Sequence, residues 1–286
     1  MKVLVTGGCG FIGHELIKKL KDDPDLEIYS LDISKTSLVS ADNVKYFVGS
    51  TKNIRELISF KPDIVYHLGE YSRIATSFQD IEILWDLNIA GTFEVLQFCR
   101  ERGSKLVYAG SSSKFGNNGA DENLSPYSWV KAKNVELIKN YGDWFGIEYA
   151  IAYFFNVYGA SQISKGKYAT VIGIFEELYK KGKPLTVVKP GTQKRYFTHI
   201  DDTIAGLIKI GHDGTGDGYC LCDTESLYSV EEAARLITGN ITYVPEQSGN
   251  REQPVIPSFK CYEELSWVPS NSLSDYIDNM KKECEK

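Results

Sequence analysis

The sequence predicts an α/β fold in which a doubly wound parallel sheet is followed by a smaller C-terminal lobe. In the first half of the 286 residues, short apolar segments alternate with stretches of helical periodicity, as in chains of βαβ units. A glycine-rich turn separates the first apolar segment from the first helical one. After about residue 159, glycine and proline interrupt shorter elements and the alternation is lost. Right-handed crossovers between parallel strands then place helices on both faces of the sheet.

The expected elements follow one another regularly through the first half. Residues 3–6 form an apolar run that ends in glycines, which is typical of a buried strand. Residues 11–20 have apolar side chains at helical spacing, and residues 27–32 form a second strand that ends on an acid. Further strands are expected at residues 44–48, 63–67, 105–109 and 148–155, and further helices at 81–100 and from residue 126 onward.

The second half predicts a small, irregular lobe. We expect a helix at 171–181, a short strand at 185–188, and another helix near Asp202, which we interpret as its N-cap. The last stretch is rich in proline and therefore in loops. We divide the chain into a cofactor-binding sheet domain, residues 1–159, and a lobe, residues 160–286, that mainly binds substrate and has elements able to return to the sheet.

Composition and charge exclude several classes of protein. The chain has 32 Lys and Arg against 38 Asp and Glu, and its net charge of −6 disfavours nucleic acid and anionic membranes as partners. No apolar stretch approaches the roughly 18 residues of a membrane span, and glycines stop the first apolar run before it resembles a secretory leader. The 6 cysteines form no CxxC pair and the 4 histidines show no metal-ligand spacing. We therefore expect reduced thiols, a cytoplasmic protein and no metal.

The turn after the first strand has the glycine spacing of a dinucleotide-binding loop. Gly7, Gly10 and Gly13 give the pattern GxxGxxG between a strand and a helix. The first glycine permits a tight turn, the second lets a pyrophosphate approach the backbone, and the third lets the helix pack closely on the strand. With Phe11 and Ile12, these residues are predicted to bind a dinucleotide in a Rossmann-type domain. The alternative is an ordinary tight turn.

An acidic residue stands where such a domain holds the ribose of the cofactor. Asp32 ends the second strand, 19 residues after Gly13. A carboxylate there accepts hydrogen bonds from both ribose hydroxyls of NAD and repels the extra phosphate of NADP. Lys35 could soften that repulsion, and Asp32 could instead be an ordinary turn residue. We predict NAD as the cofactor.

A tyrosine and a lysine four residues apart form a candidate catalytic pair. Tyr127 and Lys131 fall on one face of the expected helix. A phenol, with an ordinary pKa of about 10, is a poor base at neutral pH, but a nearby ammonium favours the phenolate. The pair could then remove a proton from an alcohol that is being oxidised. The alternative is a solvated pair of helix residues.

Serines follow the fifth expected strand. In the segment 110–113, Gly-Ser-Ser-Ser, a hydroxyl at the carboxyl edge of the sheet could hydrogen-bond the reacting oxygen, because open α/β sheets bind ligands at that edge. A serine-rich turn without a role in catalysis is the alternative.

Together these segments resemble the extended short-chain dehydrogenase/reductase family, and within it the NAD-dependent nucleotide-sugar epimerases and dehydratases, closest in type to UDP-glucose 4-epimerases. The resemblance covers essentially the whole chain. No single segment is specific, but the combination is. The segments that carry it are the glycine loop, Asp32, His67-Leu68, Asn88-x-x-Gly91-Thr92, the serine turn, Tyr127 with Lys131, Asn156-Val157-Tyr158-Gly159, and residues 195–202.

The resemblance implies roles for the matching residues. Ser111 matches the catalytic Ser or Thr, Tyr127 the base, and Lys131 its partner. Asn156 matches a residue that contacts the sugar or its diphosphate, and Arg195 an arginine that binds the diphosphate, which a bidentate guanidinium suits. The remaining assignments are Ser112 and Arg251 as substrate contacts, and Ser50, Leu68, Tyr127 and Lys131 as cofactor contacts.

Departures from the family pattern narrow the expected reaction. Its 4,6-dehydratases carry Asp-Glu after the catalytic Thr, whereas this chain has Ser112 and Ser113, and a serine hydroxyl is a poor general acid or base. The fucose-synthase branch needs a Cys that the serine turn lacks. We therefore favour a nucleotide-sugar 4-epimerase that works through a transient 4-keto sugar. The alternative is a 4-dehydrogenase or 4-ketoreductase; a 4,6-dehydratase or a non-catalytic NAD-binding protein is less favoured.

Three positions and one surface complete the expectations. Ser50 stands where the family usually has an Asp near the adenine, and the residues around Arg251 fit the family pattern poorly. Glu70 replaces a small residue, and we interpret it either as a contact to a sugar hydroxyl or as a solvated loop acid. The resemblance also implies a homodimer formed through two helices per subunit, at about residues 81–100 and 126–141.

Overall fold

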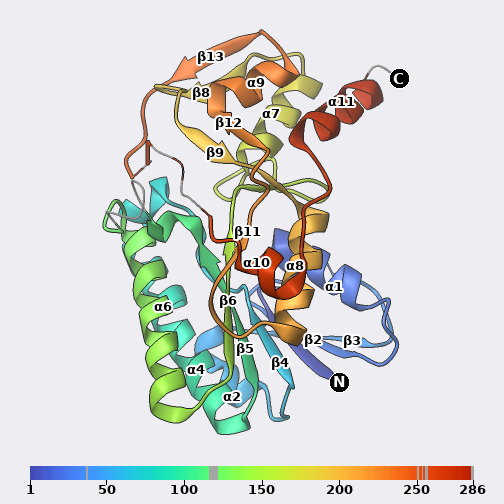
Figure 1. The fold of residues 1–286 in the computed structure, drawn as a ribbon, viewed down its shortest axis with the longest axis vertical. Helices are drawn as coiled ribbons and strands as arrows, with labels where there is room; N and C mark the ends of the chain where they lie inside the picture. The colour runs from blue at the N-terminus through green and yellow to red at the C-terminus, as the bar shows by residue number, and fades with distance from the viewer. Residues whose placement is uncertain (37, 116–121, 250, 253, 255–256, 285–286) are drawn as a thin grey trace.

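A seven-stranded parallel sheet forms the centre of the computed structural model, which describes residues 1–36, 38–115, 122–249, 251–252, 254 and 257–284 (Figure 1). The strand order is β11-β6-β5-β4-β1-β2-β3, and every neighbouring pair is parallel. This order confirms the predicted doubly wound α/β fold. The strands are β1 (Lys2–Thr6), β2 (Glu27–Asp32), β3 (Val44–Val48), β4 (Ile64–His67), β5 (Lys105–Ser111), β6 (Tyr149–Phe154) and β11 (Gly216–Leu221).

Helices cover both faces of the sheet, which explains why its strands are apolar on both sides (Figure 1). Along β1, Val3 and Val5 join the core under one layer of helices, whereas Leu4 joins the core under the other. One layer contains α1 (Phe11–Leu20), α8 (Ile200–Asp213) and α10 (Lys260–Leu265); the other contains α2 (Ile54–Leu57), α4 (Gly91–Arg102) and α6 (Pro126–Phe145).

A smaller lobe with its own core lies beyond one end of the sheet (Figure 1). Phe175 and Leu185 are fully buried in this core. Within the lobe β8 pairs with β13 in parallel and β9 pairs with β12 antiparallel. Its elements are α7 (Val171–Lys180), β8 (Leu185–Val188), β9 (Lys194–Tyr196), β12 (Leu227–Ser229), α9 (Val230–Ile237), β13 (Ile241–Val244) and α11 (Leu273–Cys284).

Short elements connect the sheet to the lobe and complete the chain. β7 and β10 pair in parallel, and β11 runs from the second half of the chain back into the main sheet beside β6. The remaining elements are η1 (Thr51–Asn53), η2 (Ala75–Phe78), α3 (Ile81–Leu84), η3 (Trp85–Ala90), η4 (Ser112–Phe115), β7 (Val157–Tyr158) and β10 (Thr198–His199).

Two helices differ in detail from the sequence predictions. The helix expected at 81–100 consists of α3, a π-helical segment η3 and α4, which ends at Arg102. The N-cap predicted at Asp202 is wrong. His199 is the N-cap of α8 and its side chain accepts from Asp201 N. The Asp202 carboxylate instead accepts from Asn271 N at 2.9 Å, so it ties α8 to the C-terminal segment.

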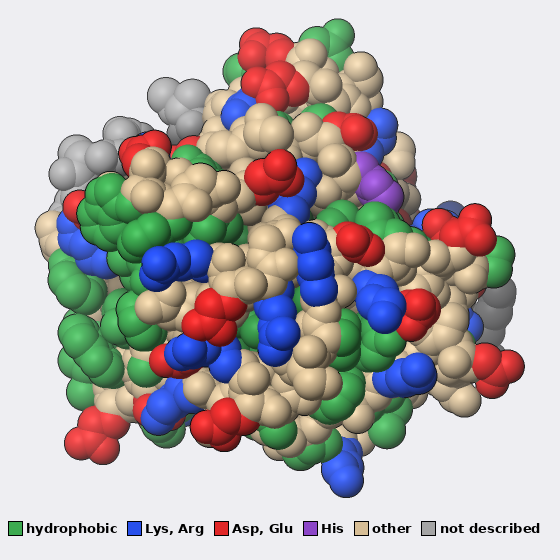
Figure 2. Space-filling model, turned by 90° about the horizontal axis from the view of Figure 1, so that it is seen from below, with side chains coloured by type: hydrophobic (Ala, Val, Ile, Leu, Met, Phe, Trp, Pro, Cys, Tyr) green, Lys and Arg blue, Asp and Glu red, His purple; other side chains and the backbone are tan. Residues whose placement is uncertain are grey.

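Apolar side chains are exposed on the helices along one side of the molecule. Ile81, Ile83 and Trp85 are about half exposed, and the ring of Trp85 stacks on that of Trp129 from α6 with centroids 6.3 Å apart. Figure 2 shows hydrophobic side chains gathered along the edge on the side where Figure 1 places α6. Within the described ranges, no helix combines the length and apolarity needed to cross a membrane.

Candidate active site

Most of the predicted site residues line one cavity at the carboxyl edge of the sheet. Its volume is about 760 Å³, and its walls come from the loops after the strands and from the lobe. The structure therefore brings together positions that are up to 244 residues apart in sequence. The predicted residues that line it are Gly7, Gly10, Phe11, Ile12, Gly13, Asp32, Leu68, Ser111, Ser112, Tyr127, Lys131, Asn156, Arg195 and Arg251.

The glycine loop is shaped as the sequence predicts for a phosphate cradle. Gly7 has a φ of 73°, and a Cβ there would lie 2.7 Å from Gly69 N. A Cβ on Gly13 would lie 2.2 Å from Gly7 O, so only glycine lets α1 approach the loop this closely. Gly10 is the N-cap of α1 and has no side chain to cap the helix. The first N–H groups of α1 can therefore face an anion.

The carboxylate of Asp32 is fixed at the end of β2. It accepts hydrogen bonds from Cys9 N and Ser34 N, both at 2.9 Å. These bonds tie the glycine loop to the strand and leave other lone pairs for hydroxyl donors. The cradle, the uncapped helix and the acid at the strand end fit a dinucleotide with a free ribose diol.

Ser50 is the one predicted cofactor contact that does not line the cavity. Its side chain accepts from Lys52 N and caps η1. Its neighbours Gly49 and Thr51 line the cavity, whereas Ser50 is not among the lining residues. The contact between Ser50 and the adenine therefore stays a prediction.

The candidate base lies in the first turn of α6. Ser125 is the N-cap and accepts from Ser128 N, and Pro126 occupies the first turn, which together fix where the helix begins. Tyr127 and Lys131 are both buried, and the Nζ atom of Lys131 lies 6.0 Å from the centroid of the Tyr127 ring. The predicted pair is thus on one helix face, with both side chains largely buried at the wall of the cavity.

The serine turn supplies hydroxyl groups to the same cavity. Ser111 Oγ and Ser113 Oγ are 2.8 Å apart, and Ser111 Oγ also accepts from Ser113 N. Ser112 is contacted by Arg251, whose guanidinium donates to its carbonyl oxygen at 2.8 Å and to its Oγ at 3.2 Å. Three serines in a row therefore have three different hydrogen-bonding environments.

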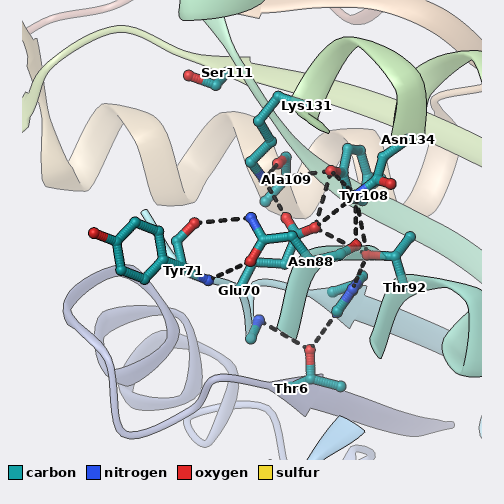
Figure 3. Close-up of polar contacts among 12 residues, drawn as sticks. Thr6, Glu70, Tyr71, Asn88, Thr92, Tyr108, Ala109, Ser111, Lys131 and Asn134 are labelled. Atoms are coloured by element: carbon teal, nitrogen blue, oxygen red, sulfur yellow. Dashed lines mark hydrogen bonds and ion pairs between the residues drawn. The ribbon is translucent and has the colours of Figure 1, made fainter. Parts of the chain in front are cut away.

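Glu70 is buried against Lys131 of the candidate pair, so the interpretation of Glu70 as a solvated loop acid is wrong. Its carboxylate accepts from Lys131 Nζ in a buried ion pair (Figure 3). Thr92 Oγ1, Asn134 Nδ2 and Tyr108 OH also donate to it, at 2.9, 3.0 and 3.1 Å. Figure 3 shows Ser111 outside this network. Sequence reasoning singled out Glu70 as unusual but missed Asn134 and Tyr108.

A buried histidine connects this network to β1. His67 is fully buried on β4, with Nδ1 2.7 Å from Thr6 Oγ1 and Nε2 3.0 Å from Thr92 Oγ1. Thr92 donates its hydroxyl proton to Glu70, so His67 donates from Nε2. Burial lowers the pKa of His67 to about 4. The imidazole is therefore neutral at physiological pH.

Two arginines, the buried Arg251 and the partly buried Arg195, lie side by side at the wall of the cavity. Arg195 donates to the carbonyl oxygen of Arg251 at 2.6 Å, and no carboxylate in the described part of the chain pairs with either guanidinium. Burial lowers the pKa of Arg195 to about 10; burial and the neighbouring Arg195 lower that of Arg251 to about 9. Arg251 Nε is buried with no described hydrogen-bond partner. This arrangement favours a bound anion.

Comparison with known proteins agrees with this geometry. Residues 3–218 match the family described as NAD dependent epimerase/dehydratase. The chain is 34% identical to a Methanocaldococcus jannaschii protein provisionally named UDP-glucose 4-epimerase, over 96% of this chain and 95% of that one. It is 26% identical to UDP-glucuronic acid decarboxylase 6 of Arabidopsis thaliana, over 99% and 88% of the two chains. Its fold is similar to that of the Thermotoga maritima UDP-glucose 4-epimerase solved with UDP-glucose, with a TM-score of 0.88, 22% identity and complete coverage of both chains.

The depressed pKa of His67 predicts a loss of stability in acid. Between pH 6.5 and about 4 the unfolded chain binds a proton at this position and the folded chain does not, so the free energy of unfolding falls as the pH falls. In His67→Gln this fall is smaller, by about 2 kcal/mol between pH 7 and pH 5. Urea unfolding at pH 7 and pH 5 measures it.

The exposed His212 supplies the control for this experiment. His212→Gln should keep the pH dependence of the wild-type protein. If His67→Gln and the wild type had equal pH dependence, the assignment of a neutral imidazole with a lowered pKa to His67 would be contradicted.

Proposed function

This chain belongs to the NAD dependent epimerase/dehydratase family, and we propose that it is a nucleotide-sugar 4-epimerase that works through a transient 4-keto sugar. Members of the family are enzymes and use NAD, which when bound supplies reversible two-electron redox chemistry. One observation carries the proposal: Tyr127 shares a single cavity with the glycine loop and with the arginine pair.

Tyr127 is the proposed base. Oxidation at C4 of a sugar requires removal of the proton from the C4 hydroxyl, and a phenolate at the wall of the cavity can take it. Lys131 lies behind the ring, with its Nζ atom 6.0 Å from the ring centroid, where a positive charge would stabilise a phenolate during the reaction. Ser111, also in the cavity, would hydrogen-bond the reacting oxygen and orient it.

Arg195 and Arg251 are proposed to bind the diphosphate of a nucleotide sugar. The guanidinium of Arg251 is buried and that of Arg195 is partly buried, neither has an acidic partner among the described residues, and a diphosphate supplies charge and acceptor oxygens for both. The orphaned Nε of Arg251 supports this role. Asn156 lines the same cavity and donates to Tyr196 O at 2.7 Å, which leaves its amide oxygen for the substrate.

The serine turn favours oxidation at C4 without elimination of water. Ser112 Oγ accepts from Arg251 and Ser113 Oγ contacts Ser111, so neither hydroxyl has a basic partner that would make it an acid–base catalyst. A 4,6-dehydratase is therefore disfavoured. A 4-dehydrogenase or 4-ketoreductase, in which the sugar reacts once and leaves, is the alternative. A protein that only binds NAD would not need Ser111, Tyr127 and Lys131.

We further propose that the enzyme is a cytoplasmic homodimer. The exposed apolar side chains of α3 and η3 lie beside those of α6, and burial against a second copy would stabilise them. The six free cysteines favour a reducing compartment.

The reaction is tested by NMR of UDP-hexoses incubated with purified protein. We expect a sugar and its C4 epimer to interconvert without added NAD, because an epimerase consumes no net oxidant. The panel should include UDP-glucose and UDP-glucuronic acid. Net formation of NADH with no epimer would identify a one-way oxidoreductase, and loss of carbon dioxide from the uronic acid would identify a decarboxylase.

The base is tested by Tyr127→Phe. The substitution removes only the hydroxyl, so kcat should fall about a hundredfold or more while co-purified NAD remains bound. NAD released on denaturation is measured by absorbance. Tyr262→Phe, at a tyrosine 63% exposed, is the matched control and should keep full turnover. Full turnover by Tyr127→Phe would show that another group is the base.

The dimer is tested by analytical ultracentrifugation. The wild-type protein should sediment as two chains, and Trp85→Glu should sediment as one, because a carboxylate cannot be buried in an apolar interface without a partner. Phe259→Glu, at another exposed aromatic residue, controls for added charge. A monomeric wild type, or a Trp85→Glu dimer as stable as wild type, would reject this interface.

A further inference from the structure

A buried carboxylate lies behind the catalytic pair and has no role in the mechanism described so far. The side chain of Glu70 is only 2% exposed, and its loop follows directly on β4. Oε1 accepts from Thr92, Tyr108 and Asn134, and Oε2 accepts from Lys131. These four donors come from different parts of the chain: α4, β5 and α6. Three donors on Oε1 and the ammonium on Oε2 hold the carboxylate in place at the wall of the cavity.

Lys131 is saturated by the same network. An ammonium has three N–H donors. In this structure they face the Glu70 carboxylate, the carbonyl oxygen of Ala109 at 2.6 Å and the hydroxyl oxygen of Tyr108 at 3.4 Å (Figure 3). No N–H remains for Tyr127. In this arrangement Lys131 acts on the phenol as a positive charge at a distance, rather than through a hydrogen bond.

The surroundings make Glu70 the counter-charge of Lys131. The lysine side chain is 4% exposed, and a buried ammonium without an anionic partner is costly. The other titratable groups that face the pair are His67, Tyr108 and Tyr127. His67 is neutral, and burial together with the Glu70 charge raises the pKa of Tyr108 well above its usual value, so Tyr108 stays a donor. Glu70 therefore carries the compensating negative charge.

We propose that Glu70 is a positioning residue that keeps Lys131 charged and fixed behind Tyr127. The proposal rests on the function proposed above, in which Tyr127 is the base. Glu70 touches neither substrate nor reacting atoms in this role and acts only through Lys131. It follows that its removal changes the rate of the chemical step and not the binding of substrate.

The variant Glu70→Gln tests this directly, because it keeps the shape of the side chain and removes its charge. With the UDP-hexose that the wild-type enzyme turns over, we expect kcat to fall about tenfold or more, KM to change less than about twofold, and NAD to remain bound. The matched control is Glu177→Gln, which removes the carboxylate of a surface Glu–Lys pair on α7 and should leave both constants unchanged. Full turnover by Glu70→Gln would overturn the proposal.

A double-mutant cycle with Lys131→Met separates positioning from a general structural role. If Glu70 acts through Lys131, Glu70→Gln costs no further turnover once the lysine is absent. An equal loss of turnover in both backgrounds would overturn the proposal, because it would show that Glu70 acts independently of the lysine.

Thermal unfolding provides a readout that does not depend on the reaction. Glu70→Gln should lower the Tm of the wild-type protein by roughly 5–10 °C, because it leaves the Lys131 cation buried alone. In the Lys131→Met background it should raise the Tm, because it removes a carboxylate that is then unpaired. Loss of stability in both backgrounds would reject the charge pairing. If the wild type turns over no nucleotide sugar, the function proposed above fails, while this cycle still tests the pairing.

Discussion

Because all seven strands of the main sheet run parallel, the segments that follow β1, β2, β4, β5 and β6 all begin at the same edge. The glycine loop follows β1, Asp32 ends β2, Glu70 follows β4 and the serine turn follows β5. None of these segments forms a binding or reaction site by itself. The direction of the strands gathers them around one cavity, which the lobe then closes from the other side.

The positive side chains at this cavity differ in whether a carboxylate of the protein pairs with them. Lys131 is paired with Glu70 inside the fold. Arg195 and Arg251 have carbonyl and hydroxyl partners, with no carboxylate among the described residues. A buried cation without an anion raises the free energy of the folded chain, and an anionic ligand recovers that energy when it binds. The arginines without a carboxylate partner thus favour the binding of an anionic ligand. The paired lysine, in contrast, is held in place before any ligand binds.

The sequence was sufficient for the elements that depend on local patterns. Periodicity placed β2, β3, α1 and β8 at their observed bounds, and glycine spacing identified the loop that a Cβ on Gly13 would fill. Patterns could not show that β11 returns to the sheet, because strand order depends on contacts between distant segments. They also misplaced the N-cap of α8. Aspartate is a common N-cap residue, but the carboxylate of Asp202 accepts a hydrogen bond from Asn271 N, which is distant in sequence.

The contacts of Glu70 also could not be predicted from local sequence patterns, because they come from distant segments of the chain. Its sequence context marks an unusual acid after β4, but only the fold brings Lys131 of α6 and Thr92 of α4 to it. The Nζ atom of Lys131 lies 6.0 Å from the centroid of the Tyr127 ring, and two unit charges at such a separation interact by about 3 kcal/mol at an effective dielectric of 20. The carboxylate subtracts from this by an amount set by its own distance. The two charges act on the phenol of Tyr127 in opposite directions, so their combined effect depends on where the ammonium is held. The hydrogen bonds that Lys131 makes to Glu70 and Ala109 therefore fix how far its charge lies from the phenol of Tyr127.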